Sequence, residues 1–211
     1  PYSDGKLNLF LLSMMRQLAP GNRLPVIGDT FSGTAIGSRY AEVLSVRLGG
    51  EYVGLAESIA KAPLANWGSE YSLWYRSPDL SGSGRKQTLQ RTEWFPGWHV
   101  GVLRGAEGSQ GTALFFNGNE HAWTLPSGHK HQDILSISYY AFDQELASDR
   151  GYFSGSSQQL PDGRSGQLWA GSSLSHNLVV VDEKSQATKE AGSNLELFGA
   201  MPGIEVIQAS A

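Results

Sequence analysis

The sequence of 211 residues contains no cysteine, carries little net charge and has no long hydrophobic run. The absence of cysteine excludes a disulfide scaffold, a thiolate metal site and a cysteine nucleophile. A formal charge of -4, from 16 Lys and Arg against 20 Asp and Glu, argues against a general nucleic-acid binder. The most apolar stretch, residues 7–15, is too short to span a bilayer. We therefore expect a folded protein that builds its own core, with neither nucleic acid nor a membrane span.

Several common signatures are also missing. There is no Walker loop, no G-x-S-x-G elbow and no dinucleotide fingerprint. The first residue is Pro1 rather than methionine, and no basic segment followed by an apolar one precedes the first helical pattern. We expect the chain to be a piece of a longer protein and to contain no signal peptide.

Residues 1–79 carry apolar side chains at helical spacing. The first run follows Asp4, an expected N-cap, and stops at Pro20 and Gly21. Further runs within the same region end at Gly or Pro and cover residues 36–48, 52–62 and 66–75. Short helices joined by brief turns predict stacked helical hairpins, as in an α-solenoid or a toroid.

The pattern changes after a predicted linker at residues 80–93, which contains S-G-S-G and a basic pair. Residues 94–211 carry runs with strand character, separated by Gly and Asn turns: 100–103, 113–116, 134–140, 178–182, 195–198 and 204–207. Strands following helices predict an α+β protein in two parts, with helical hairpins first and an antiparallel β-sandwich second. We expect the last strand to be cut short and the chain to be truncated at both ends.

Histidines next to the predicted strands are the main chemical candidates. His129 and His131 occur in G-H-K-H-Q-D, and an extended backbone from residue 128 would place them on one face with Asp133. Asp149 and His176 lie at the edges of other expected strands. Two imidazoles and a carboxylate without thiolate suit zinc or another divalent cation. The ordinary alternative is a hydrogen-bonded surface pair, because spacing alone does not bring these residues together.

Aromatic and basic side chains supply weaker candidates for substrate contact. Trp98 can stack on a sugar ring or close an interface between the helical and sheet regions. Arg150 and Arg164 flank Gly-rich loops and can meet an anionic substrate, whereas a solvated surface position is the default for each.

Three ordered motifs resemble the heparinase II/III-like polysaccharide lyases. They are G-H-K-H-Q-D-I-L-S-I at 128–137, D-R-G-Y at 149–152 and S-H-N-L-V-V-V-D at 175–182. In addition, P-V-I-G-D at 25–29 is similar to the segment that closes the helical toroid of that family. The resemblance implies the end of an (α/α) toroid followed by antiparallel β-sheets, with the active site in the cleft between them.

The resemblance also implies roles for particular residues. His129 would be catalytic, either neutralising a uronate carboxylate or assisting proton transfer. Zinc would be held by His131, Asp149 and His176, with Asp133 and Asn177 as framework residues around them and Tyr152 of D-R-G-Y near the substrate. The usual D-P-G of the family is D-R-G here. The catalytic tyrosine and its Asn or His partner are expected upstream of Pro1, and Tyr2 is not assigned to that role.

The implied function is β-elimination of a uronic-acid-containing anionic polysaccharide, of glycosaminoglycan or alginate type, in the periplasm or outside the cell. This segment alone is expected to be inactive or only feebly active. One alternative is a cupin-like metal enzyme, although cupins place a Glu soon after H-x-H and none follows here until Glu145. Another is a non-catalytic carbohydrate-binding domain. The sequence does not specify the polymer, internal or terminal attack, the metal, or the oligomeric state.

Overall fold

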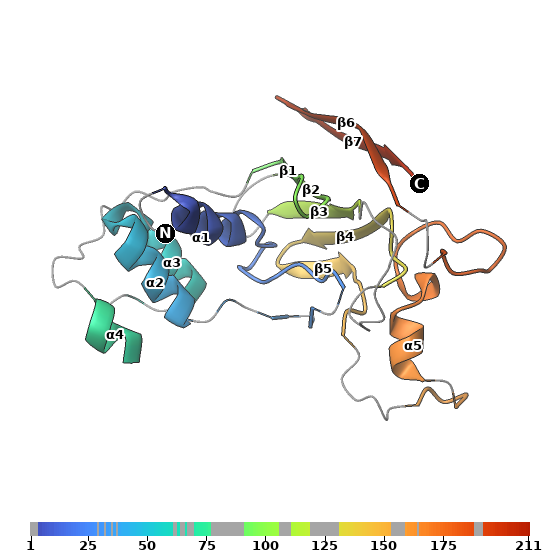
Figure 1. Ribbon diagram of the computed structural model, residues 1–211, viewed down its shortest axis with the longest axis horizontal. Coiled ribbons are helices and arrows are strands. Elements are labelled where there is room, and N and C mark those ends of the chain that lie inside the picture. The colour runs from blue at the N-terminus through green and yellow to red at the C-terminus, as the bar shows by residue number, and fades with distance from the viewer. Residues whose placement is uncertain are drawn as a thin grey trace. The chain divides into compact units, whose positions relative to one another are not determined.

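The computed structural model describes residues 4–28, 30–31, 33–34, 36, 38–60, 63, 66, 70–76, 91–105, 111–118, 131–152, 159–163, 165–187 and 192–211. The chain forms two compact units. One comprises Pro1–Leu18, Asn22–Leu24 and Thr34–Gln90, and the other comprises Ala19–Gly21, Pro25–Gly33 and Arg91–Ala211. The first is helical and the second is built on β-strands, which is an α+β architecture (Figure 1). Among the described helices, none combines the length and the apolar character that a membrane crossing requires.

In the part of the helical unit that the structure describes, five helical elements have assigned bounds. These are α1 (Lys6–Arg16), α2 (Ser38–Leu48), η1 (Gly50–Tyr52), α3 (Val53–Ala60) and α4 (Glu70–Tyr75). The helical interpretation of this region is confirmed, but the N-cap expected at Asp4 is wrong by one position. Gly5 occupies the cap with φ 75°, a conformation that glycine adopts at no steric cost, and Asp4 Oδ1 accepts the Lys6 N–H at 3.1 Å.

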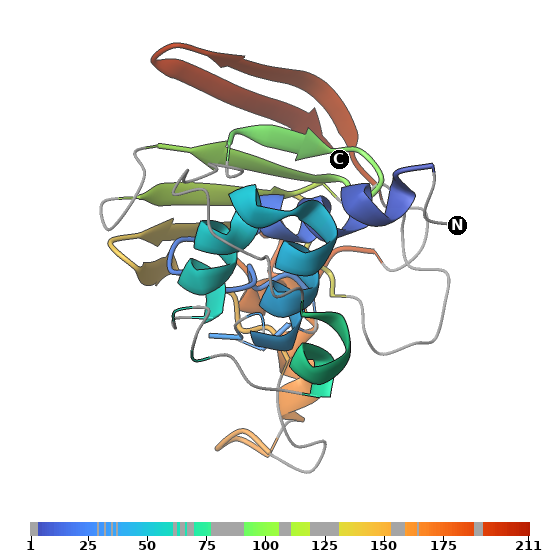
Figure 2. The same cartoon turned by 90° about the vertical axis from the view of Figure 1, so that its left-hand side faces the viewer.

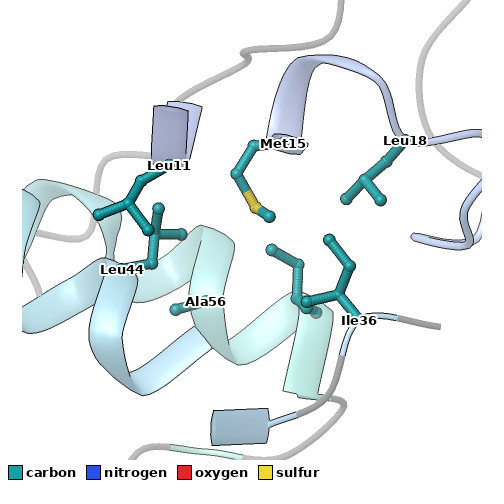
Figure 3. Packing of buried hydrophobic residues seen from close by; sticks show 7 residues of the cluster. Leu11, Met15, Leu18, Ile36, Leu44 and Ala56 are labelled. Atoms are coloured by element: carbon teal, nitrogen blue, oxygen red, sulfur yellow. The ribbon is translucent and has the colours of Figure 1, made fainter. Parts of the chain in front are cut away.

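Apolar side chains spaced along these helices meet in one core. The buried cluster, six of whose members are labelled in Figure 3, consists of Leu11, Met15, Leu18, Ile36, Leu44, Ala56 and Ile59. Helices α2 and α3 pack side by side (Figure 2). The Tyr40 hydroxyl donates to the Leu11 carbonyl at 3.0 Å, which fastens α2 to α1. Burial of this apolar stripe, more than helix propensity, holds such short helices in place.

The sheet unit is centred on a five-stranded antiparallel meander in the order β1-β2-β3-β4-β5 (Figure 1). Its strands are β1 (Glu93–Phe95), β2 (Val100–Arg104), β3 (Thr112–Asn117), β4 (Ser136–Ala141) and β5 (Gln144–Ala147). Strand β1 was not predicted, because a run of three residues is too short to show alternation, whereas β5 is the strand expected before Asp149. Val102 pairs with Phe115, and Ala113 pairs with Tyr140. This register places the large buried side chains on one face.

That face forms a second core. Its buried members are Ala19, Phe95, Val100, Val102, Ala113, Phe115 and Tyr140. A two-stranded hairpin, β6 (Asn194–Met201) and β7 (Ile204–Ser210), contacts β2. Glu205 Oε2 accepts the Arg104 N–H at 3.0 Å, and a Cβ at Gly101 would lie 2.3 Å from Ile207 Cδ1. The hairpin therefore packs against β2 at Gly101, which has no side chain.

Residues 25–33 pack with the sheet unit even though the chain on both sides belongs to the helical unit. The Val26 N–H donates to the Tyr140 hydroxyl at 3.0 Å, and Ser138 Oγ donates to the Val26 carbonyl at 3.3 Å. Further along, the Thr30 carbonyl accepts the Tyr152 N–H at 3.3 Å. The P-V-I-G-D segment is thus anchored on β4.

Two strand predictions need correction. Residues 178–182 form only an isolated bridge between Val181 and Lys184, and Val179 and Val181 are 85% and 69% exposed, so this apolar run is not a buried strand. The predicted strand 134–140 begins at Ser136, because the backbone turns at Leu135 with φ 63°. The turn therefore interrupts the extended backbone that was expected to run from the H-x-H motif into this strand. The helix α5 (Gly166–Ala170) was also missed.

Candidate metal centre

Three separate loops of the sheet unit supply the polar side chains of the candidate site. His131 and Asp133 precede the turn that leads into β4, Asp149 follows β5, and His176 follows the 3-10 turn η4 (Ser173–Ser175). All four residues are buried. Buried imidazoles and carboxylates require partners, because desolvation of polar groups costs free energy unless hydrogen bonds or metal bonds replace the lost water.

His131, Asp133 and His176 each present one ligand atom, and these atoms lie within 4.8 Å of one another. The two imidazole ring centroids are 5.1 Å apart, with an interplanar angle of 39°. His176 Nε2 is buried and has no hydrogen-bond partner among the described residues. Two imidazoles and one carboxylate form a donor set that suits Zn²⁺, so the residues present fit a divalent cation.

Asp149 contacts this group through His176. Its Oδ2 lies 2.7 Å from His176 Nδ1, and its Oδ1 accepts the Gly151 N–H at 2.8 Å. A carboxylate accepts only, so Nδ1 of His176 is the donor, and in the neutral imidazole Nε2 is left with a lone pair. This is the arrangement in which a carboxylate orients a metal-binding histidine and increases its basicity.

Burial and charge shift the pKa values of two of these groups in the same direction. Desolvation raises the pKa of the Asp133 carboxyl to about 6, and the nearby charge of His176 only partly opposes this effect. Burial lowers the pKa of the His176 imidazole, but its hydrogen bond to Asp149 and the charges of Asp149 and Asp133 outweigh burial, so the net shift is upward. The negative carboxylates therefore favour positive charge at this position.

The turn that carries Asp149 is fixed by its neighbours. Glu145 Oε1 accepts hydrogen bonds from the Asp149 N–H and from the Tyr140 hydroxyl, both at 3.3 Å. Gly151 has φ 57°, and a Cβ there would lie 2.0 Å from the Thr30 carbonyl oxygen. Val26 and Thr30 therefore pack directly on this turn. Sequence analysis missed the contribution of Tyr140 and Glu145, which lie at ordinary strand positions.

Asn177 holds the chain beside His176. The side-chain Nδ2 donates to the Ile137 carbonyl at 3.1 Å and to the Ser148 carbonyl at 2.9 Å. The backbone carbonyl of Asn177 accepts the Ile137 N–H at 3.0 Å. These bonds connect the His176 loop to β4 and to the residue before Asp149. The side chain of Asn177 thus has the bonding of a framework residue.

The remaining candidates have varied surroundings. His129 and Arg164 lie outside the described residues. The Tyr152 ring packs against Phe31 with centroids 4.8 Å apart, and Arg150 is exposed. Trp98 is 39% exposed, with its ring centroid 6.5 Å from that of Phe95.

The roles expected for the two carboxylates, Asp149 as a zinc ligand and Asp133 as a framework residue, remain predictions. In the structure the Asp133 carboxylate belongs to the compact group of three, whereas Asp149 bonds to the far nitrogen of His176. The turn at Leu135 places Asp133 outside the regular alternation of β4. This turn is the local feature that the sequence pattern did not indicate.

The region that contains these loops matches a known protein family. The family model "Heparinase II/III-like, C-terminal" matches residues 87–199, a range that includes all four residues of the candidate centre. No curated protein sequence matches the chain.

Solved structures with a similar fold include the heparinase III BT4657 gene product, at 14% identity and a TM-score of 0.65 over 99% of this chain and 28% of that one. Heparan sulfate lyase HepC from Pedobacter heparinus is similar at 12% identity and a TM-score of 0.63, covering 99% of this chain and 29% of that one. Another heparinase III structure has 14% identity and a TM-score of 0.56, with 98% and 30% covered. At these identities the likeness establishes a shared fold, and the chain spans less than a third of the length of each structure.

Proposed function

The chain belongs to the heparinase II/III-like family, and we propose that it contributes the sheet side of the active site to a polysaccharide lyase. The proposed reaction is β-elimination in a uronic-acid-containing anionic polysaccharide, of glycosaminoglycan or alginate type. The observation that carries this proposal is the buried group of His131, Asp133 and His176 inside the region that the family model matches. The description of a similar structure as a heparan sulfate lyase supports the glycosaminoglycan class.

The proposal includes a finer account of the fold. The helices would form the end of an (α/α) toroid over residues 1–79, followed by a linker at 80–93. The meander and the β6–β7 hairpin would belong to an antiparallel β-sandwich over 94–211. In support, the helices are short, the 3-10 turn η1 joins α2 to α3, and Ile207 of the hairpin packs against Gly101 of the meander.

We assign the cation, zinc or another divalent ion, to His131, Asp133 and His176, with Asp149 orienting His176. When bound, the ion would raise the positive potential beside the substrate carboxylate. The chain's own contribution is to hold His176 Nε2 toward the ion by fixing Nδ1 on Asp149. Asn177 bonds to Ser148 and Glu145 bonds to Asp149, and these contacts fix the loop of Asp149 beside the loop of His176.

The proposed chemistry begins with removal of the proton α to the uronate carboxylate, after which the glycosidic oxygen at C4 leaves. Negative charge grows on the carboxylate as the proton departs, so a donor placed there stabilises the transition state. His129 is proposed for this role because it is the first histidine of H-x-H and its ordinary pKa of about 6.5 lies near working pH. A tyrosine from another part of the whole protein would act as the general base and then as the acid that protonates the leaving oxygen, a role worth roughly 10²–10⁴ in rate.

Contacts with the polymer are proposed for Arg150, Arg164, Tyr152 and Trp98. The guanidinium groups would bind carboxylate or sulfate, and the aromatic rings would pack against sugar. Because such polymers lie outside the cytoplasm, we propose that the protein acts in the periplasm or as a secreted protein.

The test is release of unsaturated uronates, measured as new ultraviolet absorbance when the whole protein is mixed with heparan-type and alginate-type polymers. We expect product from at least one polymer, and loss of product with retained zinc in His129→Ala. The 211-residue chain alone should give little or no product. Absence of product from every uronate polymer would overturn the lyase proposal, and glycan affinity undiminished in His129→Ala would then support a non-catalytic carbohydrate-binding domain.

The cupin-like alternative receives no support from the fold. A cupin is a closed double-stranded β barrel, whereas the described strands form an open meander and a separate hairpin. Metal-dependent redox activity without lyase activity would be its signature.

A further inference from the structure

Gln186 lies far along the sequence from H-x-H but bonds directly to that loop. The Ile134 N–H donates to Gln186 Oε1 at 2.9 Å, and Gln186 Nε2 donates to the Ile134 carbonyl at 2.8 Å. The side-chain amide thus pairs with both backbone groups of one residue, as a neighbouring strand would. Ile134 directly follows the candidate ligand Asp133.

The backbone of Gln186 also bonds to the residue between the two candidate ligands and to the His176 loop. Gln132 Nε2 donates to the Gln186 carbonyl at 2.5 Å, and the Gln186 N–H donates to Ser173 Oγ at 2.9 Å. Ser173 Oγ in turn donates to the Gln132 carbonyl at 2.6 Å. Ser173 is fully buried and begins the 3-10 turn that leads to His176.

These bonds join the two ligand-bearing loops through residues that alternate with the ligands. Gln132 and Ile134 are held by Gln186, which leaves the side chains of His131 and Asp133 to point into the candidate centre. Ser173 links the same network to the loop of His176. A metal site gains affinity when bonds outside the coordination shell fix the ligands before the ion arrives.

We propose that Gln186 is a positioning residue of the cation site, acting with Ser173 to set the distance between the H-x-H loop and His176. This inference rests on the cation site given under the proposed function. Glutamine suits the position because its carboxamide offers one donor and one acceptor at the reach that Ile134 requires. A glutamate would lack the donor, and an asparagine would be one methylene too short.

The experiment measures zinc affinity of the 211-residue chain by chelator competition, together with the visible spectrum of the Co²⁺-loaded chain. Gln186→Ala and Gln186→Asn should bind zinc about 10- to 100-fold more weakly than wild type and should alter the Co²⁺ bands. The matched control is Gln208→Ala, whose amide donates to Glu196 Oε2 on the exposed hairpin and which should leave both readouts unchanged. Wild-type zinc affinity and an unchanged spectrum in Gln186→Ala would overturn the inference.

A second readout separates this inference from the cation proposal. Hydrogen exchange of the Ile134 amide in the metal-free chain should be slow in wild type and fast in Gln186→Ala. If that difference appears but wild type binds no zinc, the cation site fails and the role of Gln186 in it fails with it, while the loop contact remains established. If wild type binds zinc but Ile134 exchanges equally fast in both chains, the positioning role alone is overturned. Should Gln186→Ala not fold, Ser173→Ala tests the same link with the same readouts.

Discussion

Asp149 Oδ2 lies 2.7 Å from His176 Nδ1, and both side chains are almost completely buried. A hydrogen bond between a carboxylate and an imidazole is stronger away from water, so this contact fixes both the tautomer and the ring orientation of His176. The other ring nitrogen is buried and makes no hydrogen bond among the described residues, so it is the atom that the proposed cation would take together with His131 and Asp133. The contact therefore connects the D-R-G turn to the candidate metal centre.

The first prediction separates the two carboxylates. Asp149→Asn should weaken zinc binding by about 10- to 100-fold, because it perturbs the group that orients His176. Asp133→Asn should weaken binding further, because it removes a charged ligand. Asp182→Asn, at an exposed turn position, is the control and should bind as wild type. Complete loss in Asp149→Asn with near-normal binding in Asp133→Asn would instead make Asp149 the ligand, as the family resemblance implies.

Zinc should also stabilise the fold, because an ion that binds only the native state adds its binding free energy to the free energy of unfolding. At a free concentration of 100 times Kd the gain is about 2.7 kcal/mol. Thermal unfolding with and without chelator measures it. His176→Ala should abolish the response, whereas His99→Ala, whose ring lies edge-on to Trp94, should keep it. A zinc response that persists in His176→Ala would place the ion elsewhere.

The close contact at Gly151 predicts a large effect of one methyl group. Gly151→Ala combines positive-φ strain, about 1–2 kcal/mol, with overpacking against Thr30 and Val26, about 1–3 kcal/mol. Gly203→Ala is the matched control, since its φ is 82° but no atom lies within 4 Å of the added Cβ. Chemical denaturation should show a clearly larger loss of stability for Gly151→Ala. Equal losses of stability in the two variants would mean that Val26 and Thr30 do not pack tightly against the turn at Gly151.

The helical unit should lose stability at high pH through Tyr40. Burial raises the pKa of its hydroxyl from 10.0 to about 12, so the folded chain retains a proton that the unfolded chain releases. Stability contributed by this group is therefore complete below pH 10 and declines between pH 10 and 12. Tyr40→Phe should reduce that decline in denaturation curves across this range, although it also loses the bond to the Leu11 carbonyl. An identical decline in both chains would contradict the assignment.

Much of the fold follows from local patterns. Regular spacing of Leu11, Met15 and Leu44 marks helix faces that the structure buries together, and alternation in β3 marks a strand with one face in the core. Residues 178–182 show the limit of this reasoning. An apolar run predicts a buried strand only if another strand pairs with it, and pairing depends on distant parts of the chain.

The candidate site was likewise only partly predictable from the sequence. His131 and His176 could be chosen as ligands from residue type and motif, whereas Asp133 was expected only as a framework residue and Asp149 as the third ligand. The structure groups His131 and His176 with Asp133. Gln186 and Tyr140 could not be chosen, because their importance comes from single hydrogen bonds to loops that are remote in sequence. The role of Asp133 was obscured by the turn at Leu135, where a side chain of this type rarely adopts positive φ.

The placement of residues 25–33 has a practical consequence for dissecting this protein. This stretch belongs to the sheet unit, whereas the residues on both sides of it belong to the helical unit. The two units therefore cannot be separated by a single cut at the predicted linker. A shortened chain beginning at residue 94 would discard Val26 and Thr30, and with them the cover over Tyr140 and Gly151. Truncations that retain the whole sheet unit must therefore begin no later than Ala19.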